Sequence, residues 1–287
     1  MKSIPVRKMH SSENETEFQK RFDIRHIGTL LLEKEIHQDL HRHNSFFVLF
    51  LEKGLGEHEI DFVSYTVGDY SVFFMRPGQV HQLTLQTGST GYMMKFMPDF
   101  YYPKSKESSQ LLRKLSNKNF CKLDRKSFNK LHSALTYIFE EYTEKQEGYE
   151  EIIKANLGVF FIELVRQRKN PESISTNSSS YAQERLDEFL ELLEIHIATY
   201  KHTSEYADML NLSKYQLNAI TKSMLGKTSS EVINEYIILE SKRYLLATSN
   251  QVNQIAYNLG YEDASYFIRF FKKHTGHSPE AFRNKCK

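Results

Sequence analysis

The chain has 287 residues, of which 40% are hydrophobic and 26% charged, enough for one large domain or two ordinary ones with their own cores. This composition excludes disorder throughout, and no run approaches the ~20 apolar residues that a membrane span needs. Lys and Arg number 38 against 36 Asp and Glu, so the net charge of +2 alone indicates no particular partner.

The start of the chain and its cysteines indicate a cytoplasmic protein with no membrane partner. Residues 1–20 are polar and charged and lack the apolar stretch of a signal peptide. The two cysteines, Cys121 and Cys286, are too few for a disulfide framework or a thiolate metal cluster. We therefore expect the protein to work in a reducing compartment.

The first half of the chain predicts a small antiparallel barrel. Residues 1–25 are predicted to form an N-terminal arm and residues 26–168 a separate domain. Aromatic and β-branched runs there are punctuated by Gly and Pro, as strands and turns are. The runs follow one another too closely for βαβ crossovers. They are Phe46–Leu51, Glu59–Val67, Tyr70–Met75 and Gly91–Met97.

Two long helices are predicted to follow the barrel, at residues 124–146 and 150–168. Apolar residues recur there at helical spacing, as in Phe128, Leu131 and Leu135. The second helix is apolar over more than one face. This predicts that it packs on the barrel and also on a second surface, either within the chain or on another subunit.

A Ser- and Asn-rich segment, residues 169–181, is predicted to be a linker. Beyond it, residues 182–287 carry helical patterns throughout. From residue 201 onward Lys and Arg number 12 and Asp and Glu number 8, so a mild positive excess lies at the C-terminal end. The helices are predicted at 183–199, 204–210, 214–225, 230–247, 252–259, 264–275 and 279–284.

The C-terminal part contains an internal repeat with a period of fifty residues. Residues 217–226 align with residues 267–276, so Lys222 and Lys272 fall in register. In each copy a small residue lies four positions before one suited to a left-handed turn, which is typical of a helix-turn-helix. These pairs are Ala207 with Asn211 and Ala256 with Gly260. One copy alone fits an ordinary helical bundle, whereas two copies in register favour DNA binding.

Residues 252–283 closely resemble the signature of transcription regulators of the AraC/XylS type. The resemblance lies in Ile255-Ala256, Leu259-Gly260-Tyr261, Phe267, Arg269, Phe271-Lys272, Gly276, Ser278-Pro279 and Phe282-Arg283. It is strong over about the last hundred residues and looser over the N-terminal half, which resembles the cupin-type sensor barrel of these regulators. The resemblance implies an α+β multidomain protein, with a cupin-like antiparallel β-barrel and two long helices followed by an all-α domain with two helix-turn-helix units.

The resemblance also implies how the all-α domain meets DNA. The helix-turn-helix units are expected at about 203–226 and 251–276, joined by a rigid linker helix at 230–247. Their recognition helices would enter adjacent major-groove segments ~34 Å apart. The expected function is a sequence-specific DNA-binding transcription regulator that responds to a small-molecule effector, with no enzymatic activity and no cofactor. Double-stranded DNA, the effector, a second copy of the chain and RNA polymerase are the expected partners.

By the same resemblance, the first recognition helix begins at Ser213-Lys214. The predicted base contacts are Tyr215, Gln216, Asn218, Ser265, Tyr266 and Arg269, because amides suit adenine and arginine suits guanine. The predicted phosphate contacts are Ser213, Lys214, Lys222, Lys227, Lys272 and Lys273. Ala219 departs from the family pattern, in which a long basic residue is frequent. The alternatives are partial burial for Tyr215 and Tyr266, and a salt bridge to Glu262 or Asp263 for Arg269.

The barrel histidines resemble the two cupin motifs in which three histidines and a carboxylate hold a metal ion. They stand in His41-Arg42-His43 and in the segment that ends at His81. Phe46, Phe47 and Val48 occupy the positions where the motif has Glu, so we expect no metal. We expect instead an effector pocket lined by His43, Phe74, His81, Tyr92 and Met94. A barrel filled by its own side chains is the alternative.

Two other classes of function stay open at this point. One is a cupin-type metalloenzyme whose helical tail binds nucleic acid incidentally, and stoichiometric bound metal would favour it. The other is a constitutive DNA-binding regulator whose ligand-free barrel serves dimerisation, and a melting temperature that no metabolite raises would favour it. Activation and repression are not distinguished by these residues.

Overall fold

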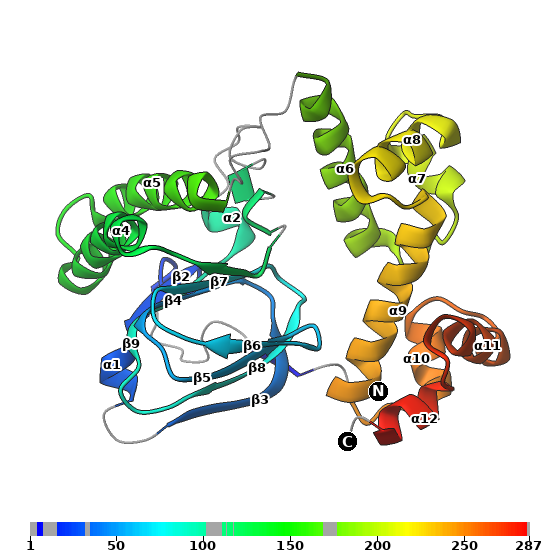
Figure 1. The fold of residues 1–287 in the computed structure, drawn as a ribbon, viewed down its shortest axis with the longest axis horizontal. Helices are drawn as coiled ribbons and strands as arrows, with labels where there is room; N and C mark the ends of the chain where they lie inside the picture. The colour runs from blue at the N-terminus through cyan, green and yellow to red at the C-terminus, as the bar shows by residue number, and fades with distance from the viewer. Residues whose placement is uncertain are drawn as a thin grey trace. The chain divides into compact units, whose positions relative to one another are not determined.

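The computed structural model describes residues 5–7, 16–31, 35–101, 111–112, 114–116, 118–168 and 177–285. The contacts divide the chain between residues 173 and 174 into two compact units, a barrel unit and a helical unit (Figure 1). Of the predicted linker, residues 169–176 lie outside the described residues, and helix α6 begins at Asn177. Within the described residues, no helix has the length and apolar character that crossing a bilayer takes.

The barrel unit consists of two five-stranded sheets. One has the order β1-β3-β8-β5-β6 and the other β10-β7-β4-β9-β2. All strand pairs are antiparallel except β1 with β3. The strands are β1 (Val6–Arg7), β2 (Phe22–His26), β3 (Ile36–His43), β4 (Phe46–Lys53), β5 (Gly56–Ile60), β6 (Val63–Val67), β7 (Ser71–Met75), β8 (Val80–Leu85), β9 (Thr90–Phe96) and β10 (Phe120–Lys122). Two short helices, α1 (Ile27–Leu30) and α2 (Pro98–Tyr101), flank them.

Some predicted strand boundaries were wrong. The run Glu59–Val67 is not one strand, because Asp61 and Phe62 adopt φ angles of 48° and 68° and reverse the chain between β5 and β6. Two consecutive residues with positive φ are typical of a tight hairpin turn, and the absence of Gly at this turn hid it. Strands β3 and β8 were not among the predicted runs, because their histidine and glutamine residues obscure the apolar alternation.

The predicted N-terminal arm, residues 1–25, is only partly described, since residues 1–4 and 8–15 lie outside the described residues. The remainder corrects the prediction. Phe18, Phe22 and Ile24 are buried in the core, and β2 pairs along its whole length with β9. Burying two phenylalanine rings and an isoleucine stabilises this segment against the sheet, so residues 16–25 belong to the barrel unit.

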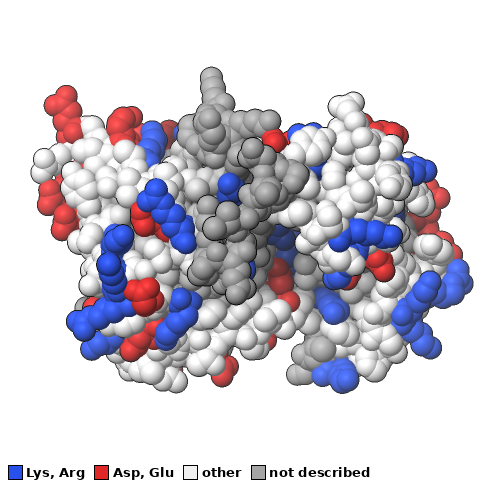
Figure 2. Space-filling view, turned by 45° about the horizontal axis from the view of Figure 1, so that its top comes forward, with Lys and Arg blue, Asp and Glu red and all other residues white. Residues whose placement is uncertain are grey.

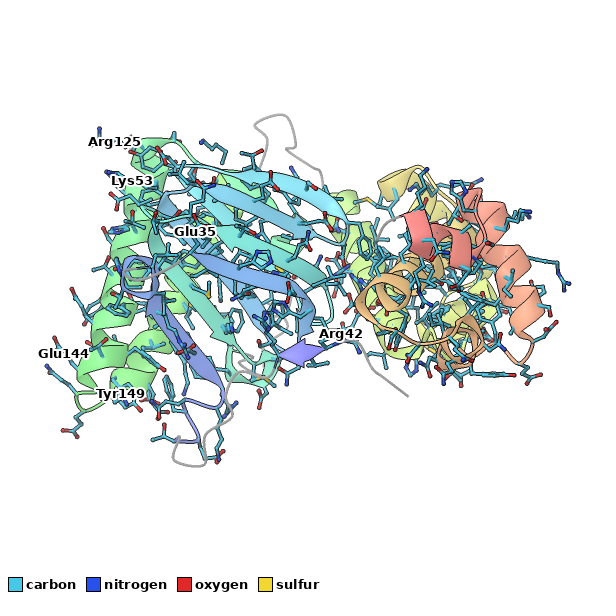
Figure 3. All side chains as sticks on the ribbon, turned by 90° about the horizontal axis from the view of Figure 1, so that it is seen from below. Glu35, Arg42, Lys53, Arg125, Glu144 and Tyr149 are labelled. Carbon is cyan, nitrogen blue, oxygen red and sulfur yellow. The ribbon has the colours of Figure 1, made fainter. Side chains whose placement is uncertain are left out.

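Helices α4 (Arg125–Glu144) and α5 (Tyr149–Arg168) cover the outer face of the sheet that contains β4. The side chains of β4 alternate between the two faces of this sheet. Phe46, Val48 and Phe50 face the helices, where the ring of Phe50 stacks on Phe128 at a centroid distance of 4.4 Å. Phe47, Leu49 and Leu51 face the barrel interior. Figure 3 shows Glu144 and Tyr149 at the turn that joins the two helices.

The helical unit is organised around the long helix α9 (Ser229–Ala247). Helices α7 (Thr203–Met209) and α8 (Lys214–Leu225) lie at one end of α9, and α10 (Val252–Asn258), α11 (Ala264–Thr275) and α12 (Pro279–Lys285) at the other (Figure 1). Helix α6 (Asn177–His196) packs on the first group through Phe189, whose ring contacts Tyr206. At 1.5 Å per residue, the 19 residues of α9 span about 28 Å.

The predicted left-handed turn residues are confirmed. Asn211 has φ 54° and Gly260 has φ 73°, and the alanines four positions earlier, Ala207 and Ala256, are buried. The small alanine side chains let the paired helices approach closely, as the repeat predicts. The two copies therefore share the left-handed turn between their helices.

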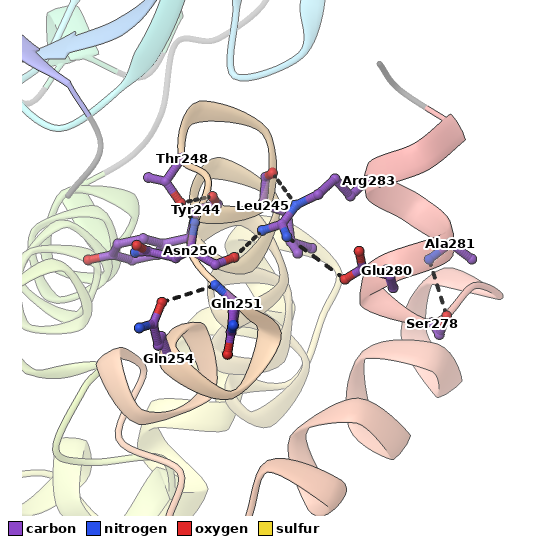
Figure 4. Close-up of polar contacts among 10 residues, drawn as sticks. All are labelled: Tyr244, Leu245, Thr248, Asn250, Gln251, Gln254, Ser278, Glu280, Ala281 and Arg283. Atoms are coloured by element: carbon purple, nitrogen blue, oxygen red, sulfur yellow. Dashed lines mark hydrogen bonds and ion pairs between the residues drawn. The ribbon is translucent and has the colours of Figure 1, made fainter. Parts of the chain in front are cut away.

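A buried arginine ties the end of the chain to the rest of the helical unit (Figure 4). Arg283 on α12 donates from Nε to the Leu245 carbonyl at 2.9 Å and from a terminal nitrogen to the Asn250 carbonyl at 2.6 Å. These carbonyls lie at the C-terminal end of α9 and in the loop that follows, where the helix itself supplies no donors. The guanidinium therefore stabilises the α9 C-terminus and holds α12 beside it.

Among the glycines of the helical unit, Gly260 lies closest to another backbone segment. A Cβ atom placed there would lie 1.6 Å from the carbonyl oxygen of Ala198, in the segment that follows α6. Lys201 strengthens this junction, because its ammonium donates to the Gly260 carbonyl at 3.0 Å. The turn of the second helix-turn-helix is thus packed against the segment that leads into the first.

We expect Gly260→Ala to lower the free energy of unfolding of the helical unit far more than Gly276→Ala. Both positions have positive φ, which costs an alanine about 1 kcal/mol, but a Cβ atom added at Gly276 would meet no other atom within 4 Å. The backbone clash at Gly260 adds about 1–3 kcal/mol. Urea unfolding followed by circular dichroism measures both variants, and equal losses would contradict the packing of Gly260 on Ala198.

Candidate nucleic-acid interface and barrel interior

The two helix-turn-helix units expose the same positions of their second helices. In α8 the exposed residues near the N-terminal end are Tyr215, Gln216 and Ala219, and in α11 their counterparts are Ser265, Tyr266 and Arg269. The intervening Leu217 and Phe267 are fully buried. The repeat therefore exposes the same face of both helices. The two faces differ in that α8 has the methyl group of Ala219 where α11 has the guanidinium of Arg269.

The N-terminal end of α8 is closed by a reciprocal cap. The Ser213 hydroxyl accepts from the Gln216 backbone N–H at 3.2 Å, and the Gln216 side-chain oxygen accepts from the Ser213 N–H at 2.8 Å. Such a capping box stabilises the helix start. The side-chain oxygen of Gln216 is thus engaged, and its amide group remains as a donor on an exposed side chain.

Asn218 has a structural role that sequence reasoning missed. Its side-chain oxygen accepts from the backbone N–H of Ser229 at 2.9 Å and from the Ser229 hydroxyl at 2.8 Å, at the start of α9. A bidentate contact with adenine would need this oxygen. In this structure Asn218 joins the recognition helix α8 to the linker helix α9. Because its side-chain oxygen is used in that contact, Asn218 cannot make the predicted bidentate contact with a base.

We expect Asn218→Ala to lower the free energy of unfolding of the helical unit by about 1–3 kcal/mol, because it leaves the backbone N–H of the fully buried Ser229 without its acceptor, while the Ser229 hydroxyl keeps the Thr203 hydroxyl as a partner. Asn218→Asp keeps the acceptor at a helix N-terminus and should restore most of the loss. Urea titration measures both, with the exposed Asn253→Ala as control. Equal instability of the two Asn218 variants would contradict this role.

Tyr215, Tyr266 and Arg269 are all available on the surface. Tyr215 is 83% exposed and Tyr266 57%, so the alternative of burial between helices does not hold for Tyr215. Arg269 lies 4.0 Å from Asp263, and both side chains are exposed, which makes this ion pair weak. An open pocket of about 340 Å³ between α9 and α11 is lined by Asn234, Tyr266, Arg269, Phe270, Lys273 and His274.

The lysines predicted to contact phosphates are exposed, with one difference among them. Lys227 forms an ion pair with Glu235 at 2.6 Å, whereas no ion pair is found for Lys214, Lys272 or Lys273 among the described residues. Basic and acidic side chains are mixed over the face seen in Figure 2. On that face the basic side chains are therefore interrupted by acidic ones.

The predicted effector pocket does not form as expected. His43 and His81 face the barrel interior, where both rings lie beside Phe47. Phe74, Tyr92 and Met94 belong to the core on the opposite face of the sheet, beneath α4 and α5. The reason is the two-residue alternation of strands, which places even and odd residues of β7 and β9 on different faces.

Two further histidines join His43 and His81 inside the barrel. His41 Nε2 lies 3.1 Å from His43 Nε2 and 3.1 Å from His81 Nε2, and His58 Nε2 lies 2.9 Å from His81 Nδ1. All four side chains are buried. Sequence analysis singled out His41 as part of a motif but not as part of the pocket, and His58 was missed because its strand was not resolved as a separate element.

Burial keeps these histidines neutral near pH 7. Desolvation lowers the pKa of His41 to about 4 and the pKa values of His43 and His58 to about 3, and it holds the pKa of His81 well below its ordinary value. Lys95, on β9, adds a positive charge that lowers the pKa of His43 further. Neutral imidazoles are the form that binds metal ions and polar ligands.

Comparisons with known proteins agree with this architecture. Residues 206–285 match the family described as helix-turn-helix domain, and residues 31–158 match the family described as AraC-like ligand binding domain. The chain is 22% identical over 248 residues to the HTH-type transcriptional activator RhaS of Escherichia fergusonii, which covers 85% of this chain and 86% of that protein.

Two further similarities differ in extent. The bifunctional transcriptional activator/DNA repair enzyme AdaA of Bacillus subtilis is 30% identical over 112 residues, covering 39% of this chain and 53% of that protein. The crystal structure of unsaturated fatty acid-bound ToxT from Vibrio cholerae is 18% identical with a TM-score of 0.43, covering 95% of this chain and 97% of that chain.

An AraC-like ligand-binding domain followed by a helix-turn-helix domain defines a regulator of transcription. The chain belongs to the AraC family of transcription regulators, which confirms the resemblance found in the sequence. The predicted fold class, a β-rich domain followed by a helical one, is confirmed as well.

Proposed function

We propose that the chain is a sequence-specific DNA-binding regulator that reads two adjacent major-groove segments through α8 and α11. The observation that carries this proposal is the equivalent exposure of the same helix positions in both copies of the repeat, on either side of α9. Tyr215 and the amide of Gln216 would read the first segment, and Ser265, Tyr266 and Arg269 the second. Ser213, Lys214, Lys222, Lys227, Lys272 and Lys273 would hold phosphates.

The two units are not equal readers in this proposal. Arg269 can donate two hydrogen bonds to guanine, whereas its counterpart Ala219 can only contact a thymine methyl group. Asn218 is held by Ser229 and positions the helix. We therefore assign most of the sequence discrimination to α11. Because Lys227 is paired with Glu235, we rank it as the weakest of the phosphate contacts.

We expect Arg269→Ala to weaken binding to the preferred DNA sequence by about 1–3 kcal/mol and to relax the preference at one base pair, because it removes a bidentate contact. Lys272→Ala, which removes an exposed lysine on the same helix, should weaken binding to all sequences alike and reduce the salt dependence. Sequence selection from random duplexes, followed by fluorescence anisotropy on selected and scrambled DNA, measures both. An equal loss on both DNAs for Arg269→Ala would refute the base-reading role.

We further propose that the chain forms a homodimer through α5. Helix α5 buries Ile153, Leu157 and Phe160 in the core of the barrel unit, yet Val159 and Ile162 are 54% and 43% exposed on the other side. These residues lie one helical turn apart on one stripe, with the exposed Ala155 on the same line. A two-fold axis would bring the same stripe of two chains together and bury it.

The dimer is tested by charge substitution on this stripe. The double variant Val159→Asp with Ile162→Asp should sediment as a monomer, because carboxylates cannot be buried at the interface without a partner. Ile195→Asp, at an apolar position of α6 that is 63% exposed, is the matched control and should leave the mass unchanged. A double variant that still sediments as a dimer would place the interface elsewhere.

The barrel unit is proposed to act as the sensor, with its ligand held in the barrel interior beside the histidines. A ligand that favours one arrangement of this unit would shift the population of DNA-binding states. Since its relative RhaS is named as a transcriptional activator, we include RNA polymerase among the proposed partners. We propose no catalytic activity for the chain.

A further inference from the structure

The four buried histidines are placed by backbone register. His41 and His43 lie on β3, His81 on β8 and His58 on β5, which are consecutive strands of one sheet. His41 and His81 are direct cross-strand partners. Residues two apart in a strand share a face, so His41 and His43 both point inward. The pairing of the barrel strands therefore brings these rings together.

The hydrogen bonds of the cluster cannot be completed by neutral rings alone. The Nδ1 atoms of His41 and His43 donate to the carbonyls of Asp39 and Arg7, at 2.6 Å and 3.1 Å, because a carbonyl can only accept. Each neutral ring carries one N–H, so two protons remain for the three ring-to-ring contacts. The Nε2 atoms of His41 and His43 thus face each other at 3.1 Å with lone pairs and no proton of their own between them.

A cation at the meeting point of the Nε2 atoms removes this conflict. Zn²⁺ binds imidazole nitrogen at about 2.0–2.1 Å, so two such ligands at a tetrahedral angle lie about 3.3–3.4 Å apart. The observed separations are 3.1 Å for His41 with His43 and 3.1 Å for His41 with His81, and all three atoms lie within 4.8 Å of one another. To coordinate one ion, the rings of His43 and His81 would have to bring their nitrogens from within 4.8 Å to this spacing.

We propose that His41, His43 and His81 bind a first-row divalent transition metal ion of the Zn²⁺ class through their Nε2 atoms. Three imidazoles without a carboxylate suit zinc or copper better than magnesium, calcium or manganese. The sequence-based expectation of no metal rested on the missing Glu, and three histidines with one open position are a known set for zinc.

The surroundings of the three ligands fit this assignment. Metal-binding histidines generally donate their second ring N–H to a carbonyl or another acceptor, which fixes the orientation of the ring. Asp39 and Arg7 provide such carbonyls for His41 and His43. His58 provides the acceptor for His81, whose Nδ1 lies 2.9 Å away. His58 is thus a positioning residue, and its own Nδ1 is buried without a partner.

The fourth position of the metal selects an anion. Phe47, at one of the sequence positions where the cupin motif has Glu, stacks on His43 and contacts His81. Lys95, on the adjacent β9, places its ammonium 6.0 Å from the centroid of the Phe47 ring. The positive charge of this ammonium repels a metal dication. An anionic fourth ligand, such as hydroxide, a halide or a carboxylate, would offset that repulsion.

The test uses the full chain without an affinity tag. After dialysis against a chelator and then buffer, we expect one Zn²⁺ per chain by elemental analysis and calorimetric titration, and a raised melting temperature on binding. Co²⁺ in place of Zn²⁺ should give the intense visible absorption of a four-coordinate site. Because these measurements need no DNA, their outcome is separate from that of the DNA-binding proposal.

Variants identify the ligands. His43→Gln and His81→Gln should each weaken Zn²⁺ binding at least 100-fold, and His58→Gln should weaken it about 10–100-fold because it only orients a ligand. His37→Gln, on the same strand but 72% exposed at its side chain, is the matched control and should bind normally.

Three results would overturn the assignment. They are a wild-type chain that takes up no stoichiometric Zn²⁺ or Co²⁺, a Co²⁺ spectrum typical of six-coordination, or full binding by both His43→Gln and His81→Gln. Circular dichroism shows whether each variant folds. If one does not, the Zn²⁺ stoichiometry and the Co²⁺ spectrum of the wild-type chain still test the metal site.

Discussion

The barrel unit depends on the strict alternation of side chains in the sheet that contains β4. Both faces of this sheet are apolar, and each is committed to a different neighbour. The face with Phe46, Val48 and Phe50 is covered by α4 and α5, while the face with Phe47, Leu49 and Leu51 closes the barrel. A shift of one residue in the register of β4 would exchange the two faces, so the contact of Phe47 with the histidines and the packing of the helices on Phe46, Val48 and Phe50 are fixed together.

The helical unit solves a different problem, which is to hold two similar recognition helices at a defined spacing. The repeat supplies two copies of one motif, and α9 sets the distance between them. Three contacts keep the copies from moving independently. Asn218 joins α8 to the start of α9, Arg283 joins α12 to its end, and Gly260 lets the second turn pack on the segment before α7. Groups at the ends of the helices thus carry much of the rigidity that reading DNA requires.

Much of the fold could be predicted from the sequence, because helices and left-handed turns leave local signals. The bounds of α8 and α11 were predicted to the residue, as were the positive φ angles of Asn211 and Gly260. The strands were harder, since β3 and β8 are rich in polar side chains that face a closed interior. Such strands lack apolar alternation, and no local sequence pattern indicates that their histidines are buried.

The candidate sites divide in the same way. The exposed positions of the recognition helices came from the resemblance to a known family, whereas the predicted pocket in the barrel combined residues of two opposite faces of a sheet. The pairing of His41 with His81 depends on which strands are neighbours, and this is a long-range property that spacing along the chain does not reveal. Likewise, Asn218 looked like a reader of bases because its partner Ser229 lies on another helix.

The parallel pairing of β1 with β3 has a consequence for the chemistry inside the barrel. Arg7 and His43 are partners in this pair, and the Arg7 carbonyl fixes which nitrogen of the His43 ring carries hydrogen. Without that strand the imidazole would be able to exchange tautomers. The two residues of β1 therefore help to set the protonation pattern of the barrel interior. Another chain segment that displaced β1 from this edge of the sheet would change the basicity of the His43 Nε2 atom.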